Sequence, residues 1–90
     1  MAKFKIAETE TFSKKRAAAK YRSISKKLID YVYPILSENP FFGPNIKKLK
    51  GEYKEIYKYI IGDYRVFYKI SEETVIVFIL DIEARKDAYK

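Results

Sequence analysis

The chain has 90 residues, with 19 lysines and arginines against 12 aspartates and glutamates, and it contains neither histidine nor cysteine. This inventory excludes disulfides, thiol or imidazole catalysis and the usual zinc sites. The formal net charge of +7 favours a polyanionic partner such as RNA, DNA or an acidic protein. No segment has the apolar length of a signal peptide or a membrane span. We therefore expect one cytoplasmic domain over residues 1–90, with no membrane contact.

The N-terminal third predicts a strand followed by helix. Residues 4–9 alternate weakly between apolar and polar side chains, as a short strand does. Thr9, Thr11 and Ser13 can each cap the helix that the composition of residues 13–20 favours. Farther on, one apolar stripe runs along a helix at spacings of three and four; its positions are Tyr21, Ile24, Leu28, Val32, Ile35 and Leu36.

Residues 10–37 can form one helix or a hairpin of two. The candidate break is Ser23 or Ser25, acting as a new N-cap. We prefer two helices, because shorter helices fill a small domain more easily. Pro34 lacks an amide hydrogen, so it should kink the second helix or end it near Tyr33. Residues 37–45 hold two prolines and a glycine and are interpreted as a connecting loop.

Three strands are predicted at about residues 53–61, 64–70 and 74–82. The Gly62-Asp63 pair between the first two suits a type II′ hairpin turn. This turn places Ile60 opposite Arg65 and Lys58 opposite Phe67. Lys58 and Arg65 then lie diagonally on one sheet face, roughly 7–8 Å apart at Cα and within reach of one phosphodiester.

The last hairpin should turn at residues 71–73. Residues 75–80 are all apolar, which predicts a central strand covered on both faces. The complete pattern is an α+β fold: an N-terminal strand, a two-helix hairpin, and a three-strand antiparallel meander in one mainly antiparallel sheet with the helices on one face.

Cations are concentrated in the C-terminal half of the chain. They are Lys47, Lys48, Lys50, Lys54, Lys58, Arg65, Lys69, Arg85 and Lys86. A solvated surface explains any single lysine, and a salt bridge to Asp81 or Glu83 would explain Arg65. Arg85 and Tyr89 share a face if the C-terminus forms a helical turn. A frayed tail is the alternative.

Four short motifs follow one another along the second half of the chain. They are Leu49-Lys50-Gly51, Ile56-Tyr57-Lys58, Ile61-Gly62-Asp63-Tyr64-Arg65-Val66-Phe67-Tyr68 and Ala84-Arg85-Lys86-Asp87-Ala88-Tyr89. In this order they resemble the RelE/ParE toxin superfamily, and within it the RelE-like branch. The resemblance implies the toxin of a type II toxin–antitoxin system: a ribosome-dependent endoribonuclease that cuts mRNA in the A site. In such enzymes the 2′-OH attacks the adjacent phosphate without a metal or other cofactor. The implied partners are the ribosome, mRNA and a short acidic antitoxin with a DNA-binding half.

The resemblance also implies roles for individual residues. Arg65 matches an arginine that clamps the phosphate and the transition state, and Lys58 matches a basic residue that binds phosphate or assists proton transfer. Arg85 and Tyr89 match the C-terminal arginine and tyrosine, the tyrosine being the candidate general base or a stacking platform. The expected RNA- and ribosome-binding residues are Lys47, Lys48, Lys50, Lys54, Lys69 and Lys86.

The chain departs from this pattern at two points. Ile60 stands where RelE-like toxins often carry a second basic residue, and the active-site histidine of some relatives is missing. Lys54 or Lys50 could compensate. Two alternatives remain open: a ParE-like inhibitor of DNA gyrase, which needs no catalytic residues, and a weakly active or non-cleaving basic module that binds RNA or ribosomes.

Overall fold

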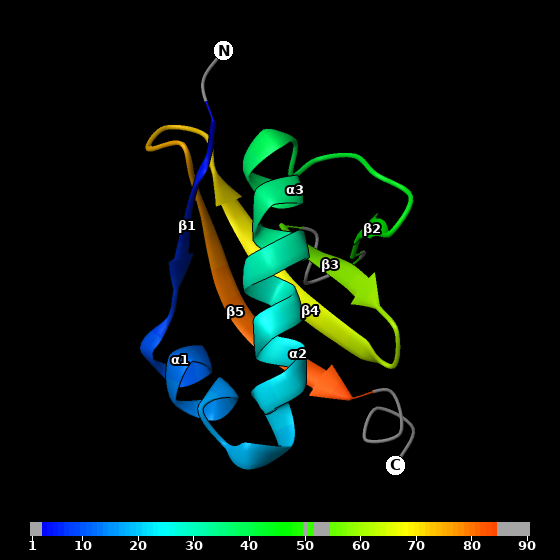
Figure 1. Ribbon diagram of the computed structural model, residues 1–90. Coiled ribbons are helices and arrows are strands. Elements are labelled where there is room, and N and C mark those ends of the chain that lie inside the picture. The colour runs from blue at the N-terminus through cyan, green and yellow to red at the C-terminus, as the bar shows by residue number, and fades with distance from the viewer. Residues whose placement is uncertain (1–2, 50, 52–54, 85–90) are drawn as a thin grey trace.

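The structure, a computed structural model, describes residues 3–49, 51 and 55–84. Its five strands are β1 (Lys5–Glu8), β2 (Ile46–Lys48), β3 (Ile56–Ile61), β4 (Tyr64–Ser71) and β5 (Ile76–Ala84). They form one sheet in the order β1-β5-β4-β3-β2, in which β1 is parallel to β5 and all other neighbours are antiparallel. The helices lie on one face of the sheet (Figure 1). The predicted α+β class and the antiparallel meander are therefore confirmed.

Strand β2 has no counterpart among the predicted strands. It contains three residues, two of them lysines, and so carries no strand signal of its own. It forms because β3 offers an edge: Ile46 lies opposite Tyr59, and Lys48 lies opposite Tyr57. The loop predicted for residues 37–45 therefore ends in a fifth strand at the edge of the sheet.

The helical region breaks earlier than predicted. Helix α1 (Glu10–Arg16) begins at Thr9, whose Oγ1 accepts a hydrogen bond from the Phe12 amide at 3.2 Å. The chain then becomes extended at Ala18 and continues through a 3₁₀ turn (Ala19–Tyr21). The prediction of a break at Ser23 or Ser25 is thus wrong. Ser25 stabilises the actual break from inside the next helix, since its Oγ donates to the carbonyl of Arg16 at 3.1 Å.

The second helical segment runs past Pro34. It consists of α2 (Arg22–Lys27), a π-helical turn (Leu28–Val32) and α3 (Tyr33–Glu38). The Tyr33 amide donates to the Leu28 carbonyl, and this wider turn leaves Pro34 in the first turn of α3, where a missing amide hydrogen costs little. The helix therefore does not end near Tyr33. In the described part of the chain, no helix combines the length and the apolar character that crossing a membrane would demand.

The core lies between the helices and the inner face of the sheet. From the helices it takes Phe12, Tyr21, Ile24, Leu28, Val32 and Leu36, and from the sheet Tyr59, Val66, Tyr68, Val77, Ile79 and Ile82. The predicted helical stripe is confirmed except at Ile35, which is 45% exposed. A register shift between Phe67 and Tyr68 makes Leu80 an extra residue in β5, and this places both Ile79 and Ile82 in the core.

Strand β5 is central in the sheet but is covered by helices on one face only (Figure 1). Its inward side chain Val77 is fully buried, whereas Phe78 on the other face is half-buried. The expectation that both faces are covered is therefore wrong. Cross-strand neighbours, Ala7 on one side and Lys69 on the other, flank Phe78 instead of a second layer.

The last hairpin also turns later than predicted. Turn residues 72–75 precede β5, and Val75 has a φ of 57°. A β-branched residue is strained in this left-handed region. The amide of Lys5 donates to the Val75 carbonyl at 3.0 Å, so this turn also holds the beginning of β1.

Candidate functional site

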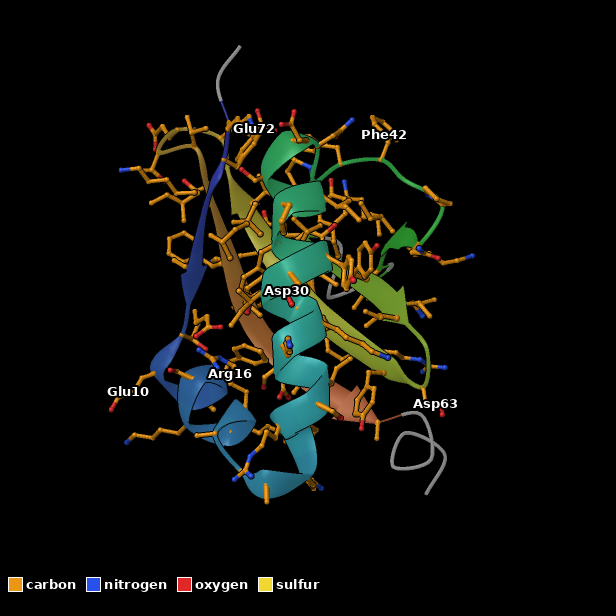
Figure 2. The ribbon with its side chains drawn as sticks, in the orientation of Figure 1. Glu10, Arg16, Asp30, Phe42, Asp63 and Glu72 are labelled. Carbon is orange, nitrogen blue, oxygen red and sulfur yellow. The ribbon has the colours of Figure 1, made fainter. Side chains whose placement is uncertain are left out.

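The β3–β4 hairpin has the predicted register. Ile61 lies opposite Tyr64, Ile60 opposite Arg65, and the intervening Gly62-Asp63 forms a two-residue turn. Gly62 has a φ of 56°, which glycine adopts without strain at the first central position of a type II′ turn. Asp63 marks this turn at the edge of the molecule (Figure 2). The local sequence thus sets which side chains share each face of the hairpin.

The hairpin divides its side chains between the core and an uncovered face. Tyr59 and Val66 point into the core, where they are 6% and 0% exposed. Lys58 and Arg65 lie on the opposite face, because adjacent strand residues alternate. We call the sheet face away from the helices the open face; on the β2–β3–β4 part of the sheet it comprises Lys47, Ile56, Lys58, Ile60, Arg65, Phe67 and Lys69.

Four cations gather on the open face. Lys47 lies directly opposite Lys58 across β2 and β3. Lys58 in turn lies opposite Phe67, and Arg65 and Lys69 stand two residues before and after Phe67 on β4. Each is therefore a diagonal neighbour of Lys58, roughly 7–8 Å away at Cα. The result is a line of positive charge that runs along the hairpin from Arg65 on β4, past Lys58 on β3, to Lys69 on β4, with Lys47 beside its centre.

Carboxylates near this line occur on β5. Glu83 lies directly opposite Arg65, and Asp81 lies opposite Phe67. Asp81 is engaged by α1: its Oδ1 accepts from Lys15 Nζ at 2.8 Å and from the Ile82 amide at 2.8 Å. Partial burial lowers the pKa of Lys15, but the Asp81 carboxylate outweighs this effect and raises it. The charge of Asp81 is therefore turned toward the helical layer.

The structure brings together some of the predicted site residues and separates others. Lys47, Lys58, Arg65 and Lys69 share the open face. Lys48 alternates to the other side of β2, and its Nζ lies 5.7 Å from the centroid of the Tyr57 ring. The predicted residues that lie outside the described part of the chain are Lys50, Lys54, Arg85, Lys86 and Tyr89.

One feature of the site escapes sequence reasoning, and a second follows from the strand pattern. The pairing of Lys47 with Lys58 depends on β2, which has no strand signal. The open face is also apolar between its cations: Ile60 is half-buried and lies directly opposite Arg65. The alternation in β3 does place Ile60 on this face, so its presence beside Arg65 could be predicted. Such a surface offers charge for phosphates and apolar area for bases or a protein segment.

Comparisons with known proteins agree with the fold and the hairpin. A family model described as the ParE toxin of the type II toxin–antitoxin system parDE matches residues 6–89. No curated protein sequence matches the chain significantly.

Several solved structures share the fold. The RelBE2 toxin–antitoxin complex of Mycobacterium tuberculosis contains a chain with a TM-score of 0.78 and 23% identity, covering 94% of each chain. The RelB–RelE complex of Methanococcus jannaschii gives a TM-score of 0.60 and 26% identity, covering 92% of this chain and 94% of that one. The DinJ–YafQ complex of E. coli gives a TM-score of 0.71 and 16% identity, covering 98% of this chain and 99% of that one.

Proposed function

This chain belongs to the ParE toxin family and is a toxin of a type II toxin–antitoxin system in the RelE/ParE superfamily, and we propose that it acts as a ribosome-dependent endoribonuclease that cleaves mRNA in the A site. The observation that carries the proposal is the line of cations on the open face. A solvated surface would not require Lys47 and Lys58 to face each other at a cost in stability. A bound phosphate backbone would neutralise both charges.

The proposed chemistry is transfer of the phosphoryl group to a neighbouring hydroxyl. The 2′-OH of one nucleotide attacks the adjacent phosphorus, a bond to the 5′-oxygen of the next nucleotide breaks, and a cyclic phosphate remains. One proton leaves the 2′-OH and one is delivered to the departing 5′-oxygen. Arg65 and Lys58 would stabilise the negative charge that builds on the phosphoryl oxygens, since such transition states gain mainly from positioned positive charge.

The proton transfers are assigned by family resemblance. Tyr89 would accept the 2′-OH proton, and Arg85 would hold the tyrosine near its charged form. A tyrosine with its usual pKa near 10 ionises more readily beside cations. Lys58 is the candidate donor to the departing 5′-oxygen. Ile60 adds no charge at the neighbouring position, so we expect slower cleavage than a site with a second cation there would give.

An antitoxin is the proposed partner in the resting state. Three of the solved structures that share the fold are toxin–antitoxin complexes with RelB or DinJ. The net charge of +7 and the open face suit a short acidic segment that orders on binding, joined to a DNA-binding half. A gene for such a protein beside the gene for this chain would support the assignment.

Gyrase inhibition is the second candidate function. The matching family model carries the name of ParE, and Ile60 occupies a position that a nuclease would use for a cation. A ParE-like protein would act by binding alone, so the open face would serve as a docking surface. This candidate predicts toxicity that survives the loss of Tyr89.

Cleavage of mRNA on programmed ribosomes tests the proposal. The wild-type chain should give discrete cuts in the A-site codon, and Arg65→Ala or Tyr89→Phe should abolish them. Arg22→Ala is the matched control, because it removes an exposed arginine from the helical side and should leave cleavage intact. Unchanged cutting in both site variants would refute the site. Intact mRNA together with failure of supercoiling by gyrase would establish the second candidate, and ribosome binding without either effect would indicate a non-cleaving module.

A further inference from the structure

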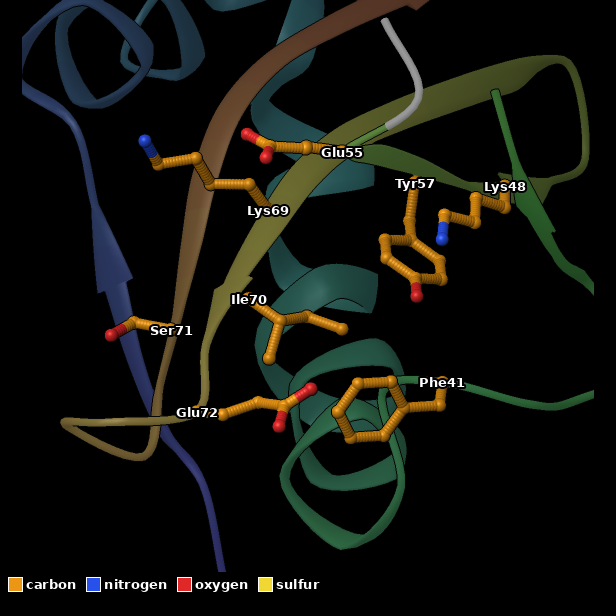
Figure 3. A pocket seen from close by; sticks show the side chains of 8 residues that line it. All are labelled: Phe41, Lys48, Glu55, Tyr57, Lys69, Ile70, Ser71 and Glu72. Atoms are coloured by element: carbon orange, nitrogen blue, oxygen red, sulfur yellow. The ribbon is translucent and has the colours of Figure 1, made fainter. Parts of the chain in front are cut away.

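A separate pocket lies at the end of the hairpin away from the Gly62-Asp63 turn. Strand β4 extends beyond the start of β3, since Lys69 pairs with Ile56 and the following residues have no partner in β3. The notch beside this unpaired end encloses about 380 Å³, which is large enough for a small ligand. Its lining residues are Phe41, Lys48, Glu55, Tyr57, Lys69, Ile70, Ser71 and Glu72 (Figure 3).

The pocket has an aromatic wall held by the core. Tyr57 stacks on the buried Tyr68, with ring centroids 5.6 Å apart and an interplanar angle of 16°. Phe41 meets Tyr57 edge to face at 6.3 Å. Because these contacts fix both rings, they present a preformed apolar surface to the opening. Lys48 Nζ lies 5.7 Å from the Tyr57 centroid, so a positive charge lies directly beside the aromatic wall.

The charged groups that line the pocket are both positive and negative. Lys48, Lys69, Glu55 and Glu72 are exposed, and among the described residues none of the four takes part in an ion pair. Two lysines disfavour a cationic occupant, and two glutamates disfavour a purely anionic one. The ligand that satisfies both carries an anionic group at one end and hydrogen-bond donors at the other, with an aromatic plane between them.

The side-chain directions suggest how such a ligand would lie. In Figure 3 the Glu72 carboxylate and the Phe41 ring border the same side of the opening, Tyr57 points into it, and Lys48 reaches toward Tyr57 from the rim. A carboxylate accepts two parallel hydrogen bonds only from adjacent donors. Among the RNA bases, guanine presents two such donors, its N1–H and its N2 amine.

We propose that this pocket binds a guanine nucleotide, with the base against Tyr57 and Phe41, the Watson–Crick edge on Glu72 and the phosphate on Lys48. Lys69 belongs both to the pocket and to the cation line of the open face. A single RNA strand can therefore run from Arg65 past Lys58 and Lys69 and place a guanine in the pocket. This path along the strand rests on the proposed function, whereas binding of a free guanine nucleotide does not.

Binding of mononucleotides to the full chain, followed by NMR shifts of the aromatic resonances, tests the pocket without ribosomes. 5′-GMP should bind at least about tenfold more tightly than 5′-AMP, and 5′-IMP should fall between them because hypoxanthine lacks the N2 amine. Glu72→Gln should remove most of this discrimination. Glu73→Gln is the matched control, since it makes the same change in the same turn at a residue that does not line the pocket.

A second variant tests the phosphate end. Lys48→Gln should weaken the binding of GMP but leave the binding of guanosine, which has no phosphate, nearly unchanged. A short single-stranded RNA that contains one guanine should bind more tightly than GMP if the ligand is part of a strand; equal affinity would identify a free nucleotide and refute the strand path. Equal binding of GMP, IMP and AMP, or unchanged discrimination in Glu72→Gln, would overturn the proposal. Binding of a charged peptide, with no binding of any nucleotide, would also overturn the proposal. Ribosomal cleavage is a separate readout, so loss of one activity does not imply loss of the other.

Discussion

Lys47 and Lys58 lie directly opposite each other across β2 and β3, so two like charges share one cross-strand position on the open face. Like charges in this arrangement destabilise a sheet. A polyanion that binds between them relieves the repulsion, and its binding free energy is correspondingly larger. The unfavourable pair is therefore both a weak point of the fold and the centre of the proposed RNA-binding surface.

Lys47→Glu should stabilise the free protein and impair its function. Replacing repulsion by an opposite-charge pair gains about 0.5–1 kcal/mol in the free energy of unfolding, measured with urea. Cleavage on ribosomes should decrease at the same time. Lys69→Glu is the control, because it changes the same charge on the same face opposite Ile56 and should stabilise less. Equal stabilisation by both variants would mean that net charge, not the pair, sets the effect.

The affinity for single-stranded RNA should depend steeply on salt. Contact with about four phosphates predicts a slope near −3 in a plot of log K against log salt, at about −0.7 per phosphate. Arg65→Ala should reduce the magnitude of this slope by about 0.7. Arg22→Ala, on the helical side, should leave it unchanged. A slope that responds equally to both substitutions would place the RNA elsewhere.

Tyr68→Phe should destabilise the fold by about 1–3 kcal/mol. The Tyr68 hydroxyl is buried and donates to the Pro40 carbonyl at 2.7 Å, and the substitution leaves that carbonyl without its partner. Tyr31→Phe is the control, since Tyr31 is 65% exposed. Comparison of the two unfolding free energies checks the prediction, and equal values would contradict it.

Stability should also fall in alkali. Burial, with the neighbouring Tyr57 and Tyr59, raises the pKa of Tyr68 above its usual value near 10. A raised pKa in the folded state contributes stability that is complete below about pH 10 and is lost as the pH rises toward the folded-state pKa. Unfolding free energies measured above pH 10 should therefore decrease with pH, and less steeply in Tyr68→Phe. Burial and the Glu8 carboxylate raise the pKa of Tyr33 as well, so a residual slope should remain.

Val75→Asn should raise the free energy of unfolding by about 1 kcal/mol. Val75 has a φ of 57°, which asparagine tolerates better than a β-branched side chain. The backbone bond from Lys5 to the Val75 carbonyl is independent of the side chain and should persist. Glu73→Asn, in the same turn without positive φ, should give no comparable gain. A loss of stability in Val75→Asn would show that packing of the valine outweighs its strain.

Much of the fold follows from patterns close together in the chain. The helical stripe from Tyr21 to Leu36 and the Gly62-Asp63 turn are local signals, because helix periodicity and turn geometry involve residues only a few positions apart. The turn alone sets the diagonal placement of Lys58 and Arg65. The order of four short motifs between Leu49 and Tyr89 was also sufficient to identify the superfamily. The sequence by itself thus determined the fold class, the superfamily and half of the cationic line.

Contacts between distant residues decided the rest. Ala17 and Ala18 favour helix, yet the chain leaves the helix there, where Phe12 and Tyr21 on either side are buried against the sheet. Lys47 reaches Lys58 only because β3 provides an edge for β2. The pocket beside Tyr57 likewise exists only because β4 continues past the first residue of β3. In each case the stabilising free energy comes from contacts between residues far apart in the chain, and local secondary-structure propensity does not depend on those contacts.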